Sequence, residues 1–187
     1  MKYTNGLLLS FLLFAAAAQA ADIRGIYVYS SDVSHISKNY AAGVTSSLSV
    51  SGVDGIVLVI GWDAIEPAMG QYDFSALDTW MREAAQSGKK VDLTITAGSA
   101  TPSWLFQNAG AKALNFTISP HSGATGVCDA EMIAPPWDAV FLSQWDSMLA
   151  AVSAHLKSTN EYDSVALLRL TGINRTTDEL RLPAETP

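Results

Sequence analysis

The sequence predicts an α/β fold, and within that class the N-terminal half of a (β/α)8 TIM barrel with about four strand–helix units. Short apolar runs alternate with segments of helical periodicity, which favours parallel strands with helices packed outside them. One of these runs alternates polar and apolar residues, as expected where one face of a sheet meets helices and the other lines a barrel. The third observation is length, because a complete barrel takes about 250 residues and this chain has 187.

The predicted strands are residues 23–29, 55–60, 91–96 and 164–170. Each run is short, rich in β-branched residues and bounded by Gly, Asp, Ser or Lys. In "VDLTIT", residues 91–96, one face carries Val91, Leu93 and Ile95, and the other carries Asp92, Thr94 and Thr96. Both faces of an open doubly wound sheet lie under helices and are apolar. The pattern therefore favours a barrel over the alternative, an open-sheet α/β domain that is complete as given.

Two segments show clear helical periodicity. The first follows Ser75, a good N-cap with Asp78 three residues on, and ends at Gly88. Its apolar stripe is Leu77, Trp80, Met81, Ala84 and Ala85. The second begins near Asp138, and its stripe is Phe141, Trp145, Met148, Leu149, Val152 and Leu156. A weaker helical pattern covers residues 37–50, whereas residues 99–137 show no period and form a long loop of the kind that is usually functional.

The first twenty residues have the pattern of a secretory signal peptide, so residues 21–187 are expected to form the partial barrel domain. Lys2 precedes the apolar run "GLLLSFLLFAAAA", and "AQA" then offers small residues for cleavage near Ala20. The apolar run is shorter than the roughly 20 residues of a membrane-spanning helix. We therefore expect export to the periplasm or the cell exterior, with no stable membrane anchor.

Charge, cysteine and histidine content exclude several classes of protein. The chain has a formal net charge of −7, and an acidic surface repels phosphate backbones, so nucleic acid is not an expected partner. Cys128 has no second cysteine to pair with, which excludes a disulfide-stapled scaffold. The loop residues His121, Cys128, Asp129 and Glu131 match no metal-loop spacing, so no metal and no cofactor are predicted. His155 is expected on the surface of the second helix.

An aromatic residue and two acids follow the second predicted strand directly. Trp62, Asp63 and Glu66 would lie at the carboxyl end of a parallel sheet, where the loops after successive strands meet. A ring there can stack on the apolar C–H face of a sugar, and carboxylates can accept hydrogen bonds from its hydroxyls. The alternative is that Trp62 packs beneath the loop and that Glu66-Pro67 is only a turn.

These residues also carry a resemblance to a known family. The stretch "GWDAIEPAMGQYDFSALDTWMREAAQSGKKVDLTITAG" resembles the second and third units of retaining glycoside hydrolase barrels, and is most similar to family 42 β-galactosidase-like proteins. The shared motif is W-x-x-I/L-E-P-x-x-G-x-Y-D-F. It is met by Trp62, Ile65, Glu66, Pro67, Gly70, Tyr72, Asp73 and Phe74, and "TPSWL" at 101–105 is compatible with it. The resemblance implies a carbohydrate substrate and hydrolysis of O-glycosidic bonds with retention.

The resemblance also implies site residues. In the resembled clan an Asn-Glu pair after the fourth strand carries the acid/base, but here Asn174 is followed by Arg175. We therefore expect Glu179 to be the acid/base and Asn174 to bind the sugar 2-hydroxyl. A capping box from Thr176 to Glu179 is the alternative role for that glutamate.

Four further residues are expected at the substrate site. Trp62 and Trp104 would stack on sugar rings, and Glu66 would position hydroxyls. Arg169 would either pair with a catalytic carboxylate or form a structural ion pair inside the barrel. The nucleophile of the clan comes from the seventh strand, so the chain as given is expected to be an inactive fragment. A secreted carbohydrate-binding barrel protein without catalysis is the second hypothesis, and no oligomeric state is predicted.

Overall fold

Four parallel strands form the centre of the fold. They are β1 (Tyr27–Tyr29), β2 (Gly55–Gly61), β3 (Lys90–Thr96) and β6 (Val165–Arg169). The sheet order is β1-β2-β3-β6, so the strands lie side by side in the order in which the chain reaches them. The computed structural model describes residues 24–29, 48–117 and 130–169. The predicted α/β class with a parallel sheet is confirmed.

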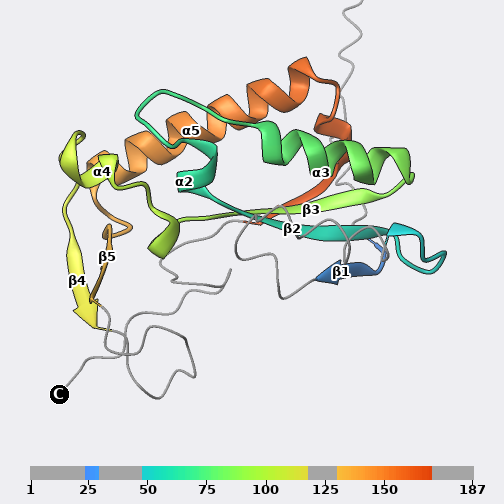
Figure 1. Ribbon diagram of the computed structural model, residues 1–187, viewed down its shortest axis with the longest axis horizontal. Coiled ribbons are helices and arrows are strands. Elements are labelled where there is room, and N and C mark those ends of the chain that lie inside the picture. Colours follow the sequence, from blue (N-terminus) through green and yellow to red (C-terminus); the bar gives the residue numbers. More distant parts are fainter. Residues whose placement is uncertain (1–23, 30–47, 118–129, 170–187) are drawn as a thin grey trace, which may run out of the picture.

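The helices that connect these strands lie on one face of the sheet. They are α2 (Trp62–Ile65), α3 (Ser75–Gln86) and α5 (Ala139–Ser158), and Figure 1 shows all three above the strands. The short elements are α4 (Trp104–Gln107) and the 3-10 helices η3 (Gly98–Ala100) and η5 (Tyr162–Ser164). The two helices with strong periodicity, α3 and α5, are found where the sequence predicts them.

The start of α3 differs from the prediction. Ser75 is the first helical residue rather than the N-cap, and the N-cap position, Phe74, makes no side-chain capping bond. The carboxylate of Asp73 accepts the Ser75 N–H at 2.9 Å instead. The start of α5 is as expected, since Asp138 is the N-cap and its Oδ1 accepts the N–H groups of Val140 and Phe141, each at 3.0 Å.

The segment predicted to lack regular structure contains several short elements. Besides η3 and α4 it holds β4 (Leu114–Thr117) and β5 (Ala130–Ile133), which pair antiparallel as a separate ribbon. The prediction failed because elements of three or four residues give about one helical turn or two strand alternations, which is too little to distinguish the two patterns. Of the weak helical pattern at residues 37–50, only residues 48–50 lie within the described part of the chain.

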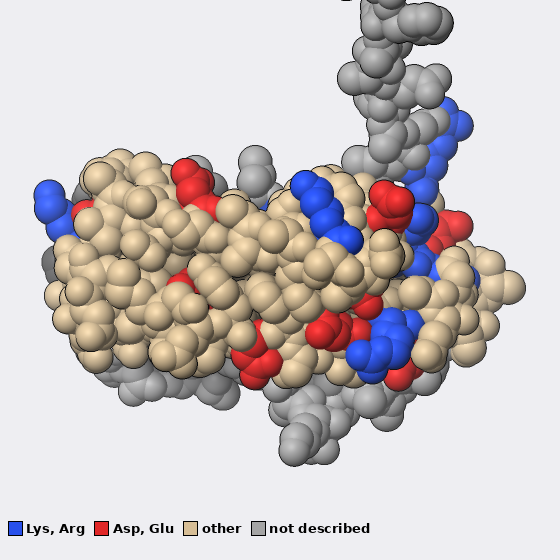
Figure 2. Space-filling model, turned by 90° about the horizontal axis from the view of Figure 1, so that it is seen from above, with Lys and Arg blue, Asp and Glu red and all other residues tan. Residues whose placement is uncertain are grey.

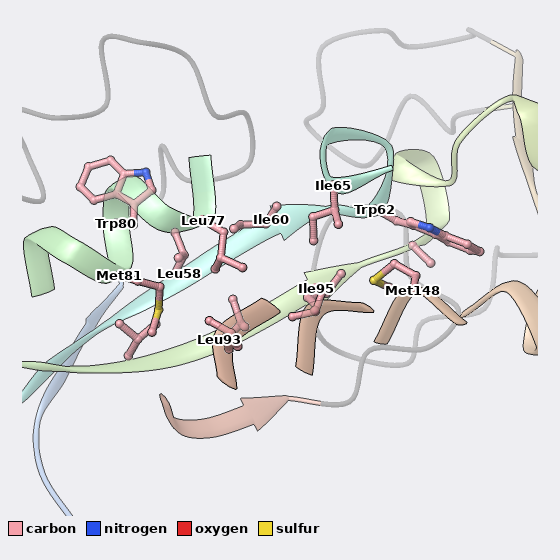
Figure 3. Close-up of a cluster of buried hydrophobic side chains, with 14 of the residues drawn as sticks. Leu58, Ile60, Trp62, Ile65, Leu77, Trp80, Met81, Leu93, Ile95 and Met148 are labelled. Carbon is pink, nitrogen blue, oxygen red and sulfur yellow. The ribbon is translucent and has the colours of Figure 1, made fainter. Parts of the chain in front are cut away.

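The hydrophobic core lies between the sheet and the helices, as Figure 3 shows. It includes Leu58 and Ile60 of β2, Leu93 and Ile95 of β3, Leu77 and Met81 of α3, and Met148 of α5. The apolar face expected for "VDLTIT" is therefore the face that meets the helices. Ala85, predicted on the buried stripe of α3, is exposed.

Candidate functional site

An aromatic cluster lies where β2 ends. Trp62 opens α2 directly after the strand, and its side chain has no exposed surface. Its ring meets Trp104 edge-on at 5.9 Å, Phe141 at 5.7 Å and Trp145 at 5.2 Å between ring centroids. The cluster thus joins the loop after β2, the helix after β3 and the first two turns of α5. Edge-to-face contacts of this kind stabilise beyond simple burial of area.

Glu66 connects the polar atoms of this cluster. Its side chain is only 1% exposed. The carboxylate Oε2 accepts the indole N–H of Trp62 at 2.9 Å, and Oε1 accepts the backbone N–H of Gly70 at 2.8 Å. The backbone carbonyl of Glu66 accepts the indole N–H of Trp104 at 2.8 Å. One residue therefore satisfies two buried indoles and the turn that follows α2.

The structure brings Trp62, Glu66 and Trp104 together, as the prediction requires, but it buries all three. Trp104 is 5% exposed, so neither indole presents a face on which a sugar could stack in this conformation. Both carboxylate oxygens of Glu66 are occupied by N–H groups of the protein. Their placement matches the packing alternative, in which Trp62 lies beneath the loop.

The loop from Glu66 to Phe74 continues into a second contact network. The ring of Tyr72 stacks on Phe74, and Phe74 stacks on the imidazole of His155 at 4.0 Å between centroids. His155 Nε2 lies 2.5 Å from Asp78 Oδ1. The expectation that His155 sits at the surface is therefore wrong, because it is held between α5, α3 and the loop. The helical pattern leaves His155 off the predicted apolar stripe of α5. It therefore does not predict a ring that stacks on Phe74 while its Nε2 contacts Asp78.

Burial and hydrogen bonding shift the pKa values of two loop residues, Tyr72 and Asp73. Burial raises the pKa of the Tyr72 phenol, and the nearby Glu66 carboxylate adds to the rise. Hydrogen bonds from the Ser75 hydroxyl and backbone N–H hold the pKa of Asp73 below its usual range. Asp73 therefore stays ionised at the N-terminus of α3, where a negative charge is favourable.

The sheet face opposite the helices carries an ion pair. Arg169 of β6 donates Nε–H to Asp92 Oδ2 at 2.9 Å and Nη2–H to the same oxygen at 2.6 Å. The Asp92 side chain is 4% exposed and that of Arg169 is 37% exposed. Of the two roles predicted for Arg169, the structure shows a pair between neighbouring strands. The alternation in "VDLTIT" and a strand arginine were the signals from which Asp92 could have been named as the partner.

Two neighbours of this pair are polar. Thr94 lies opposite Arg169 in the strand register, and its buried hydroxyl has no hydrogen-bond partner among the described residues. The pKa of Tyr27 in β1 is raised by burial and then by the charges of Asp54 and Asp92. The face away from the helices is thus polar at β1, β3 and β6.

Several of the predicted residues lie outside the described part of the chain. Asn174 and Glu179 lie outside the described residues, as do His121, Cys128 and Asp129. Within the ranges that the structure covers, no three His, Cys, Asp or Glu side chains gather as a metal site would need. No helix in those ranges has the length and apolar character needed to cross a membrane.

Comparison with known protein families gives a match over the middle of the chain. Residues 43–113 match the family model of glycoside hydrolase family 42, which is described as beta-galactosidase. The matched residues include β2, α2, α3, β3 and α4, and so contain Trp62, Glu66 and Trp104. No curated protein matches the chain. The chain therefore resembles family 42 glycoside hydrolases over the unit that holds the aromatic cluster.

Proposed function

We propose that this chain is part of an exported glycoside hydrolase with a (β/α)8 barrel, which cleaves O-glycosidic bonds with retention of configuration. The observation that carries the proposal is the family 42 match over β2, α3 and β3. Such a match implies a carbohydrate substrate. Residues 1–20 would direct export and be removed, as their signal-peptide pattern suggests.

Two features of the sheet support a barrel over an open sheet. The strands follow one another in chain order, and the helices α2, α3 and α5 lie on one face (Figure 1). A doubly wound sheet is covered by helices on both faces and is apolar on both. Here the second face carries the charged pair of Asp92 and Arg169, which suits the interior of a barrel.

The aromatic cluster would act as the rigid floor of the active-site end. Active sites of such barrels are built at the carboxyl ends of the strands, and Trp62 follows β2 directly at that end. Glu66 would hold Trp62, Trp104 and the turn at Gly70 in fixed positions. Catalytic groups on the loops above it could then keep their geometry, which retaining hydrolysis requires.

Glu179 is the proposed acid/base, and Asn174 the proposed contact to the sugar 2-hydroxyl. In the first step Glu179 would give its proton to the leaving oxygen while a second carboxylate attacks the anomeric carbon. In the second step it would take a proton from the water that releases the sugar. The two carboxyl groups of a retaining enzyme lie roughly 5 Å apart, and the nucleophile would come from a later strand of the barrel.

The test is hydrolysis of p-nitrophenyl β-D-galactoside by the full-length protein. Glu179→Gln should lower kcat by several orders of magnitude with an unchanged melting temperature. Asp178→Asn, one residue away, is the matched control and should leave kcat within a few fold of the wild type. Equal rates for Glu179→Gln and the wild type would remove Glu179 from the mechanism.

A non-catalytic carbohydrate-binding protein is the second candidate. It is favoured by Arg175, which stands where the resembled clan has its acid/base glutamate. This candidate predicts saturable binding of galactosides without turnover. Calorimetric titration of the full-length protein with a galactoside, combined with the p-nitrophenol assay, separates the two candidates. Binding without release of p-nitrophenol would support the carbohydrate-binding protein.

A further inference from the structure

One tryptophan differs from the other four in its exposure. Trp137 is 71% exposed, whereas Trp62, Trp80 and Trp104 are buried and Trp145 is partly buried within the aromatic cluster. All five tryptophans of the chain lie in described residues. An exposed indole offers a large apolar surface in water, and covering that surface with a ligand is favourable.

The backbone on both sides of Trp137 is fixed. Pro135 and Asp138 are buried, and the Asp138 N–H donates to the Pro135 carbonyl at 2.9 Å. The Asp138 side chain caps α5 and also accepts the backbone N–H of Lys112 at 3.4 Å. The exposed indole therefore stands on an ordered turn between two buried residues.

The position of this turn is the candidate-site end of the sheet. Phe141, in the first turn of α5, packs its ring against Trp62 at 5.7 Å. Because Trp62 follows the last residue of β2, the start of α5 lies at the carboxyl ends of the strands (Figure 1). Trp137 thus lies next to the aromatic cluster but outside it.

The charged residues joined to the turn of Trp137 are Asp138, which caps α5, and Lys112, whose backbone N–H that side chain accepts. Figure 2 shows that Lys, Arg, Asp and Glu gather mainly toward the end of this face opposite α4, with few at the end that carries α4. The Lys112 side chain is exposed and can donate hydrogen bonds. Leu142, in the first turns of α5, is 45% exposed. It has the spacing of a hydrophobic staple with Trp137, but such a contact leaves most of the indole in water.

We propose that Trp137 is a stacking platform for a neutral pyranose ring, forming a carbohydrate subsite at the rim of the active-site end. The proposal rests on the proposed function, which supplies the class of ligand. An indole offers a flat, rigid apolar face at low conformational cost, and the C–H face of a galactose unit matches it in size. The Nε1–H of Trp137 and the ammonium of Lys112 can donate to the hydroxyls at the edge of the ring.

The test is oxidation of the full-length protein with N-bromosuccinimide, followed by peptide mass spectrometry. In the free protein Trp137 should react before the buried Trp62, Trp80 and Trp104. A saturating sulfur-linked galactobiose, which glycosidases do not cleave, should slow its oxidation about tenfold or more. The same ligand should bind Trp137→Ala at least about tenfold more weakly than Tyr162→Ala, a control at an exposed aromatic residue beyond the other end of α5.

Any other outcome refutes the stacking platform. The outcomes also differ in whether the proposed function is refuted with it. Galactobiose binding with no protection of Trp137, or with equal affinity in Trp137→Ala, would refute the platform and leave the glycosidase proposal in place. An unreactive Trp137 in the free protein would mean that another protein surface covers it. No binding of galactobiose to the wild type would refute the platform and the β-galactoside substrate together.

Discussion

Replacing Glu66 by glutamine tests the role of the buried carboxylate with almost no change in shape. Both carboxylate oxygens accept hydrogen bonds, one from the Trp62 indole and one from the Gly70 N–H. A glutamine has one oxygen and one NH2 group, so in either orientation a donor faces a donor. The Trp104 indole bonds the backbone carbonyl of Glu66, and that bond is retained.

The size of the effect follows from these contacts. A hydrogen bond to a charged group contributes about 1.5–3 kcal/mol, and a buried donor without an acceptor costs about 1–3 kcal/mol. The variant no longer buries a charge, which offsets part of this loss. We expect Glu66→Gln to lower the free energy of unfolding by about 1–3 kcal/mol.

Urea unfolding of the full-length protein, followed by tryptophan fluorescence, measures this loss directly. Trp62 is part of the affected network, so the native spectrum should also shift. Glu83→Gln is the matched control, since Glu83 lies on α3 and is partly exposed; it should change the free energy by less than about 0.5 kcal/mol. A Glu66→Gln protein as stable as the wild type would refute the assigned hydrogen bonds.

Three further predictions concern the sheet face and the start of α5. Asp92→Ala should lower the free energy of unfolding by about 1–3 kcal/mol, moderated by the partly exposed Arg169, and a double-mutant cycle with Arg169→Ala should show coupling rather than additivity. Thr94→Val should leave stability equal or raise it by up to about 1 kcal/mol, because it removes a buried hydroxyl that has no partner within the described ranges; a clear loss in thermal melts would show that the hydroxyl is bonded. Asp138→Ala should lower the melting temperature by a few degrees through loss of the helix cap. Hydrogen bonds, first that from the Phe141 N–H, hold the folded pKa of Asp138 below its unfolded value, so its contribution is present at neutral pH and is lost as pH falls through the folded pKa; a stability difference between variant and wild type that did not shrink in acid would contradict this.

Strong periodicity made the main elements of the fold predictable. The continuous apolar run of β2, the alternation of β3 and the apolar stripe of α5 each extend over several residues and agree with one period. The one-turn helix α2 and the ribbon of β4 and β5 were missed because four residues carry too little pattern. Their formation depends on contacts with distant segments, such as the bond from Trp104 to the Glu66 carbonyl.

The sequence motif does not reveal whether the residues after β2 are exposed or buried. The motif puts Trp62 and Glu66 after β2, yet the same residues fit an exposed sugar platform and a buried support. Burial decides between these roles, and burial of Trp62 comes from Phe141 and Trp145, about eighty residues away in the chain. The pair of Asp92 and Arg169 likewise depends on β6 lying next to β3, and no local sequence pattern predicts that pairing.

The most direct test of the proposed activity is the configuration of the first sugar released by the full-length protein. Proton NMR during hydrolysis of p-nitrophenyl β-D-galactoside distinguishes the two anomers before they equilibrate. A retaining barrel glycosidase predicts that β-galactose appears first. Initial release of α-galactose would contradict retention, and no release from any β-galactoside would contradict the assignment of this activity.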